Sequence, residues 1–348
     1  VHLTVTDPVH VAKSGVYVTT PKLADTNGSD GTMNMKTTVE NTSAKPTSVT
    51  VKQTVYKQGS EVSAATTTTE TAIEIAAGAS ADITQTAKIE NPALWSPDSP
   101  ALYTLKTEVL VGNSVVDTCE TEFGFRWTTF DKVYGFALNG VKTKLKGVCM
   151  HHDQGSLGSE AWYRAIERQV EILKEMGCNA IRVTHNPAAP ELIEIANEKG
   201  IMLIDEAFDT WTNPKNGNTH DYSQWFNVVI GNDNAILGGE ADMTWAEFDI
   251  KAMVNQDKNS PAVIMYSLGN EVLEGISGNA DNYPTIASYL IDWIQEIDVT
   301  RPSTFGDNKL KSGDTTAPQV AQVIANNHGI VGYNYSTIGN LDSGTANG

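Results

Sequence analysis

The stretch "VIMYSLGNEV", residues 263–272, decides the fold of the second part of this chain. It opens with consecutive apolar residues, and a run of this kind is typical of a strand that is buried on both faces of a parallel sheet. The run then ends in a carboxamide and a carboxylate, Asn270 and Glu271. Polar groups at the end of a fully buried strand predict a site at that end.

The residues around this stretch repeat the order strand, loop, helix. We expect strands at residues 142–150, 179–184, 201–208, 262–268, near 302–306 and at 329–335. We expect helices at residues 161–177, 190–200, 243–254 and 283–297, where apolar residues recur at helical spacing. Repeated units of apolar strand and helix form a parallel sheet that is covered by helices.

Polar or ionisable side chains follow strand after strand, and this pattern separates a barrel from a doubly wound sheet. The carboxyl ends of successive barrel strands converge on one mouth, which is where barrel active sites lie. A doubly wound sheet would also need a glycine-rich phosphate turn after its first strand, and "MHHDQGSLGS" is no such turn. We therefore expect residues 125–348 to form a TIM (β/α)8 barrel, of which only about six strands can be counted.

Residues 1–124 follow a different pattern. They contain no Arg and are rich in Thr, Val and Ser. In "SVTVKQTVY", Val49, Val51 and Val55 fall on one face of a strand, and turn-like clusters separate several such runs. Seven or eight short strands at this spacing predict an antiparallel β-sandwich. The expected architecture is thus two domains, a sandwich over 1–124 and a partial barrel over 125–348.

The overall composition excludes some partners. A formal net charge of -18 disfavours nucleic acid and anionic membrane surfaces, which would repel the chain, and suits a neutral ligand. The cysteines Cys119, Cys149 and Cys178 match no metal spacing and no disulfide framework. We expect no metal, no cofactor and no membrane span. The sequence shows no signal peptide and leaves compartment open, with a secreted or cell-surface bacterial enzyme and a homo-oligomer both compatible with it.

Asn270 and Glu271 suit acid–base chemistry. An acid at the end of an apolar strand is partly withdrawn from water, which keeps its proton available near neutral pH. An adjacent amide can bind a substrate hydroxyl and fix its orientation. The alternative is structural: a turn at the end of the strand, with Glu271 capping the next helix.

Five segments carry a resemblance to a known family. In order, "LKGVCMHHD", "NAIRVTHNP", "LIDEAFDTW", "NSPAVIMYSLGNE" and "GYNY" resemble glycoside hydrolase family 2, most closely its β-galactosidase-like members. Upstream, "LWSPDSPALYTL" and "FGFRW" resemble the immunoglobulin-like domain that precedes the barrel in that family. The resemblance implies a retaining β-glycosidase that hydrolyses β-linked carbohydrates. In such enzymes one carboxylic acid protonates the leaving oxygen while a second carboxylate attacks the anomeric carbon.

The resemblance also implies roles for residues near the strand ends. Glu271 matches the general acid/base, and Asn270 matches the amide that binds the sugar 2-hydroxyl. His185 matches a histidine that contacts the sugar; the alternative is a histidine satisfied by backbone groups. His151 is similar to a pocket histidine after the first strand, although His152 leaves the register open by one residue.

Further matches lie on the later segments. Asp209 resembles a ligand of sugar hydroxyls. Trp211 resembles a stacking platform for the sugar, and plain core packing is the alternative. Tyr335 matches a tyrosine that orients the nucleophile, with Tyr333 as the less favoured choice.

Arg182 resembles the family arginine that lies near the nucleophile and holds it ionised, and Glu206 resembles a supporting acid behind the site. The nucleophilic glutamate of the family follows the seventh barrel strand, and no such strand can be found here. Glu206, Asp209 and Asp307 lie where the family places other roles. We therefore expect the nucleophile to be absent from this chain and the chain alone to have little or no glycosidase activity.

"DEAFDTW" favours terminal β-D-galactosides as the substrate, while β-glucuronidases and β-mannosidases of the same family have the same overall arrangement of motifs. A non-catalytic carbohydrate-binding role for the chain is the alternative from another functional class.

Overall fold

The computed structural model describes residues 3–57, 60–61, 66–69, 72–232, 239–276, 280–310 and 313–335. These residues form two compact units. The first unit runs to Lys144 and includes Asn197–Gly200 and Lys258–Pro261, and the second contains the remainder from Leu145 onward. The boundary expected after residue 124 stays a prediction.

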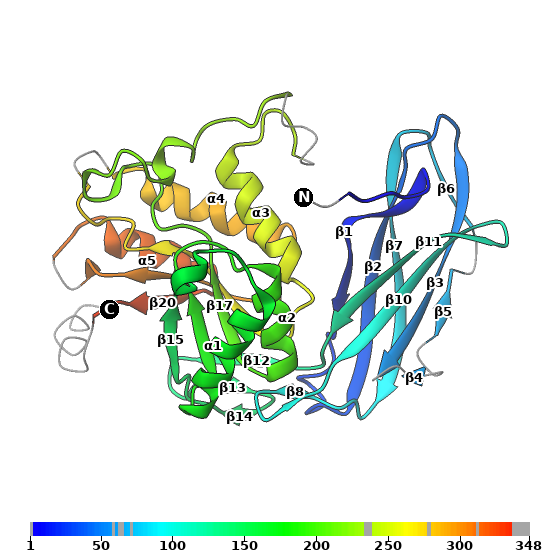
Figure 1. Ribbon diagram of the computed structural model, residues 1–348, viewed down its shortest axis with the longest axis horizontal. Coiled ribbons are helices and arrows are strands. Elements are labelled where there is room, and N and C mark those ends of the chain that lie inside the picture. The colour runs from blue at the N-terminus through cyan, green and yellow to red at the C-terminus, as the bar shows by residue number, and fades with distance from the viewer. Residues whose placement is uncertain are drawn as a thin grey trace. The chain divides into compact units, whose positions relative to one another are not determined.

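The first unit is a sandwich of two antiparallel sheets, as expected from the alternating valines (Figure 1). One sheet has the order β1 (Val9–Thr19), β2 (Asp30–Asn41), β7 (Ala79–Glu90). The other has the order β11 (Ser114–Phe123), β10 (Tyr103–Val111), β3 (Thr47–Lys57), and β3 also pairs with the short strands β4 (Ser60–Glu61), β5 (Thr67–Thr68) and β6 (Ile73–Ile75). Val49, Val51 and Val55 are fully buried in the core of this unit.

Smaller strands complete the first unit. β8 (Trp95–Ser96) pairs with β9 (Ser99–Pro100), and β12 (Thr128–Asp131), β13 (Gly135–Leu138) and β14 (Val141–Lys142) form a three-stranded sheet. The strand expected over 142–150 is therefore divided. Its first residue belongs to β14, and the first strand of the parallel sheet begins only at Gly147.

The second unit is a curled parallel sheet of six strands (Figure 1). The strands follow one another in chain order: β15 (Gly147–Met150), β16 (Ala180–Val183), β17 (Met202–Glu206), β18 (Val263–Asn270), β19 (Ser303–Asp307) and β20 (Ile330–Tyr333). Because each neighbour in the sheet is the next strand in the sequence, the topology is that of a barrel and not of a doubly wound sheet. The expected partial TIM barrel is confirmed.

Among the described residues, five α-helices connect these strands. They are α1 (Tyr163–Glu175), α2 (Pro190–Lys199), α3 (Trp245–Asp257), α4 (Tyr283–Gln295) and α5 (Ala317–Asn326), with short 3-10 turns η2 (Gly155–Leu157), η3 (Lys215–Gly217) and η4 (Tyr222–Gln224). In the part of the chain that the structure describes, no helix is both long and apolar enough to cross a membrane.

Candidate active site

The carboxyl end of β18 is the centre of the site. All eight residues of this strand are buried, and Asn270 and Glu271 are 5% and 9% exposed. The backbone N–H of Asn270 donates to Phe208 O at 3.0 Å, and that of Glu271 donates to Gly306 O at 2.7 Å. The strand end is thus fixed by backbone bonds to the chain that follows β17 on one side and to β19 on the other.

Glu206, at the end of β17, is a fully buried carboxylate with several donors around it. Its Oε2 accepts from Arg182 Nε at 3.0 Å, from Arg182 Nη2 at 2.5 Å and from Ser267 Oγ at 2.6 Å. Its Oε1 lies 2.5 Å from His185 Nδ1. Burial opposes the charge of Arg182, but the Glu206 carboxylate outweighs it and raises the pKa of the guanidinium. Both oxygens of Glu206 are therefore occupied, and its expected supporting role stays a prediction.

This buried pair also fixes the amide of Asn270. Arg182 Nη2 donates to Asn270 Oδ1 at 3.0 Å, and Asn334 Nδ2 donates to the same oxygen at 2.9 Å. Since two donors occupy the oxygen, the Asn270 amide is oriented with its NH₂ group toward Asp209, whose Oδ1 lies 3.4 Å from Nδ2. An amide held in this way presents donor hydrogens to a ligand.

Asn334 contacts Glu271 as well and was not identified from the sequence. Its Nδ2 donates to Glu271 Oε1 at 2.8 Å. Neighbouring Tyr335 hydrogen-bonds Glu271, whose negative charge raises the pKa of the tyrosine. The expected role of Tyr335 at the site stays a prediction, and its contact in this structure is with the acid/base candidate. Tyr333 is 47% exposed and Tyr335 is 79% exposed, so exposure does not distinguish the two tyrosines, and the choice of Tyr335 rests on its contact with Glu271.

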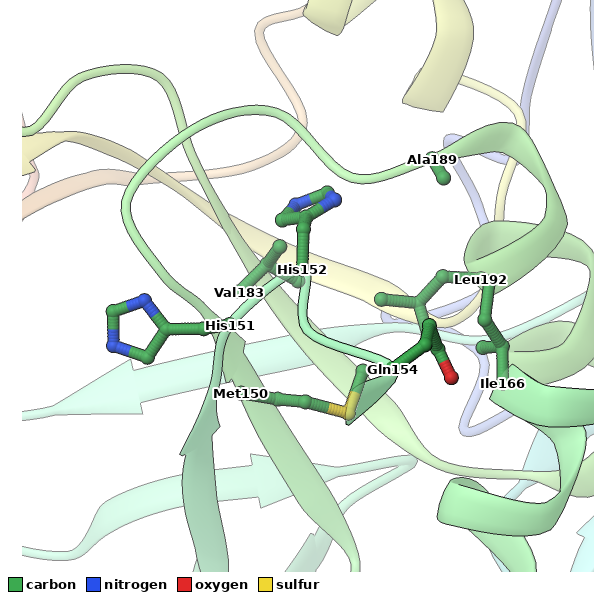
Figure 2. Close-up of a pocket in the computed structure, with 8 residues that line it drawn as sticks. All are labelled: Met150, His151, His152, Gln154, Ile166, Val183, Ala189 and Leu192. Carbon is green, nitrogen blue, oxygen red and sulfur yellow. The ribbon is translucent and has the colours of Figure 1, made fainter. Parts of the chain in front are cut away.

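The two histidines after β15 point in different directions (Figure 2). The ring of His151 meets the ring of His185 edge-on, with centroids 5.2 Å apart. His151 and His152 both line a cavity of about 20 Å³ together with Ile166 and Leu192, and burial lowers the pKa of His152. A cavity of that size holds about one water molecule and no sugar. The choice between His151 and His152 stays a prediction, and the ring contact with His185 is the observation that supports His151.

Trp211 requires a correction. Its side chain is fully buried, its Nε1 donates to Leu268 O at 2.9 Å, and its ring packs against Tyr283 with centroids 5.2 Å apart. An indole with no exposed face cannot stack on a sugar. Core packing, the alternative for this residue, is what the structure shows.

Asp209 lies beside the Asn270 amide with its side chain 49% exposed. Lys215, a loop residue that sequence reasoning missed, lies 2.7 Å from Asp209 Oδ1 through its Nζ. No periodic pattern marks this lysine, because it belongs to the irregular segment between β17 and α3.

Two other acids near the strand ends form hydrogen bonds within the protein. Asp307 is 2% exposed, accepts the backbone N–H groups of Lys309 and Leu310 at 2.9 and 2.7 Å, and has a pKa raised by burial. Asp205 accepts the backbone N–H groups of Ala188 and Glu206 at 2.9 and 3.0 Å and also contacts Asp257 of α3, and burial raises its pKa to about 7. Among the described residues, no group of three or more His, Cys, Asp or Glu side chains could hold a metal ion.

A β-sandwich that precedes a parallel half-barrel, with an acid, an amide and histidines at the strand ends, is the architecture of a barrel-type glycoside hydrolase. Two family models agree with this class. The model described as "Glycosyl hydrolases family 2, TIM barrel domain" matches residues 132–345, and the one described as "Glycosyl hydrolases family 2" matches residues 9–126. The chain belongs to glycosyl hydrolase family 2.

Relatives of known name bear this out. The β-galactosidase BoGH2A of Bacteroides ovatus is 36% identical over 343 residues, which cover 90% of this chain and 37% of that protein. A putative β-glucuronidase of Formosa agariphila is 35% identical over 220 residues, covering 63% of this chain and 18% of that protein. The crystal structure of a family 2 member from Bacteroides cellulosilyticus superimposes with a TM-score of 0.80 at 30% identity, covering 95% of this chain and 38% of that one. The chain thus spans well under half the length of these relatives.

Proposed function

We propose that this chain supplies the acid/base part of a retaining β-glycosidase site, with Glu271 as the general acid/base. The observation that carries the proposal is the position of Glu271 at the end of a fully buried strand, beside an oriented amide and in contact with Asn334 and Tyr335. A carboxyl group that is only 9% exposed and hydrogen-bonded on the rim of a barrel suits proton transfer to a leaving oxygen.

The surrounding residues would bind the sugar. The Asn270 NH₂ group would donate to the 2-hydroxyl, while His185 and His151 would contact the ring from the neighbouring strands. Arg182 and Glu206 would act indirectly, because each is engaged in the pair that orients Asn270 and His185.

The second carboxylate of the reaction would come from outside the described residues. Glu206 is saturated by Arg182, His185 and Ser267, Asp209 is paired with Lys215, and Asp307 is buried against backbone N–H groups. A nucleophile needs a free oxygen that faces the anomeric carbon. Glu206 has no free oxygen, Asp307 is buried, and Asp209 lies where the family resemblance implies a ligand of sugar hydroxyls.

For the substrate, we propose a terminal β-D-galactoside, with β-glucuronides and β-mannosides as alternatives within the same family. The name of the Bacteroides ovatus relative supports the first choice, and that of the Formosa agariphila relative supports a glucuronide.

The acid/base role is tested by Glu271→Gln in the natural protein that contains this sequence. Release of poor leaving groups should be abolished, whereas good leaving groups, which need little protonation, should suffer much less. Glu247→Gln, which alters a partly exposed acid on α3, is the matched control and should change neither rate. Equal losses for both leaving-group classes in Glu271→Gln would contradict the assignment.

The 348-residue chain alone should show little or no turnover. Hydrolysis of a chromogenic β-galactoside at roughly 1–10³ per second, the rate of an ordinary enzyme, would contradict the missing nucleophile. Binding of galactose by calorimetry without turnover in the natural protein would favour the non-catalytic carbohydrate-binding alternative.

A further inference from the structure

Lys215 is held in place by its own loop. Its backbone N–H donates to Asp221 Oδ2 at 2.8 Å, and the hydroxyl of Thr210 closes the preceding turn by donating to Asn213 O at 2.7 Å. The Lys215 side chain is only 14% exposed. A lysine with a fixed backbone and a largely buried stem does not belong to the solvated surface lysines, which are usually mobile.

The ammonium group of Lys215 reaches three acceptors. Nζ lies 2.7 Å from Asp209 Oδ1, 3.0 Å from Asn270 O and 3.3 Å from Asp209 O. An ammonium carries three protons, so these acceptors use its full donor capacity. Lys215 therefore has no donor left for a substrate and acts through the residues that it holds.

Asn270 carries the amide that is proposed to bind the sugar, and Asp209 lies beside that amide. Asn270 O is the carbonyl of the peptide that leads into Glu271, so one ammonium links Asp209 to the strand end that carries the acid/base candidate. Lys215 and the Asn270 amide both approach Oδ1 of Asp209, at 2.7 and 3.4 Å. Among the described residues, no hydrogen bond is made to Asp209 Oδ2, which leaves that oxygen for a ligand.

We propose that Lys215 is a positioning residue that fixes Asp209 as an anionic acceptor for the hydroxyl groups of an uncharged sugar. This inference rests on the proposed glycosidase function and narrows its substrate class. A carboxylate accepts strong hydrogen bonds from hydroxyl groups and repels the carboxylate of a uronic acid. Because Lys215 is saturated, it offers a uronate no compensating cation. The Asp209–Lys215 pair therefore favours a neutral sugar over a β-glucuronide at this position.

The test compares Lys215→Met, Asp209→Asn and the double variant in the natural protein that contains this sequence, with a β-galactoside and a β-glucuronide. Each single variant should raise KM for the galactoside about tenfold or more, the effect of one lost charge-assisted hydrogen bond. The double variant should be no worse than Asp209→Asn, because Lys215 acts through Asp209. Asp209→Asn should also shift kcat/KM toward the glucuronide, since the repelling charge is gone.

Lys251→Met is the control, because Lys251 on α3 pairs with Glu247 and Glu296, both at 2.6 Å, outside the pocket. It should leave KM unchanged. Unchanged KM in Lys215→Met, additive losses in the double variant, or a wild-type preference for the glucuronide would overturn the inference. If Lys215→Met does not fold, Asp209→Asn is the test, and it should still raise KM for the galactoside and shift kcat/KM toward the glucuronide. Glu271→Gln is assayed in parallel, because its leaving-group dependence tests the acid/base role and does not involve Lys215. A failure of the Lys215 inference can therefore be distinguished from a failure of the proposed function.

Discussion

Replacing Glu206 by Leu should destabilise the barrel unit strongly. The change keeps a buried side chain of similar size but removes the acceptor of Arg182, His185 and Ser267. Arg182 is only 18% exposed on its side chain, so its charge would stay in a poorly solvated position with Asn270 Oδ1 as a remaining partner. Removing one member of a buried ion pair costs about 3–5 kcal/mol, because the other charge is left uncompensated.

Urea unfolding of the 348-residue chain, followed by circular dichroism, measures this loss. With a denaturant dependence of ~2 kcal/mol per M, a loss of about 4 kcal/mol lowers the midpoint by about 2 M. Glu247→Leu is the comparison, because its pair with Lys251 at 2.6 Å is partly exposed and contributes only about 0.5 kcal/mol. The double variant Arg182→Met, Glu206→Leu should recover much of the loss. A midpoint in Glu206→Leu that matches Glu247→Leu would refute the reasoning.

Three further predictions concern other parts of the second unit. Burial raises the pKa of Asp205 to about 7 and also raises that of Asp257, so the folded state holds protons that the unfolded state releases above the ordinary value of 3.8. Stability should therefore fall as the pH rises from about 4 to about 7, and Asp257→Asn should flatten this dependence in urea unfolding across that range; an unchanged slope would count against the pair. His151→Ala should weaken galactose binding in calorimetry of the natural protein, whereas His152→Ala should not, and the reverse result would move the register by one residue. Trp211→Phe should lower stability by about 1–2 kcal/mol through its lost N–H bond, as measured by thermal unfolding, and should leave sugar binding unchanged.

The strands were predictable from the sequence where burial is continuous. Residues 262–268 read as a strand because no polar residue interrupts them, and β18 covers Val263–Asn270. The prediction of one strand over 142–150 was wrong at its start. The short exposed strand β14 and the first barrel strand β15 are separated by only four residues, so the sequence pattern merges them. Alternating residues in that connection resemble a strand although the backbone changes sheets there.

The site was predictable as far as strand ends determine it. Arg182, His185, Glu206 and Asn270 come together because parallel strands deliver their carboxyl ends to one edge of the sheet. Lys215 could not be found in this way, because the direction of a loop side chain depends on tertiary contacts and not on a periodic pattern. The burial of Trp211 was equally inaccessible for the same reason.

The hydrogen-bond and charge partners of each acid distinguish the supporting carboxylates from Glu271, the proposed general acid/base. Glu206 and Asp209 contact the cations Arg182 and Lys215. Glu271 instead contacts the amide of Asn334 and hydrogen-bonds Tyr335. Neutral partners tolerate both the protonated and the ionised form, and a retaining glycosidase requires its acid/base to alternate between them within one catalytic cycle. The backbone φ of 47° at Glu271 points the same way, because a left-handed conformation costs a non-glycine residue about 1–2 kcal/mol and is kept where function depends on the side chain.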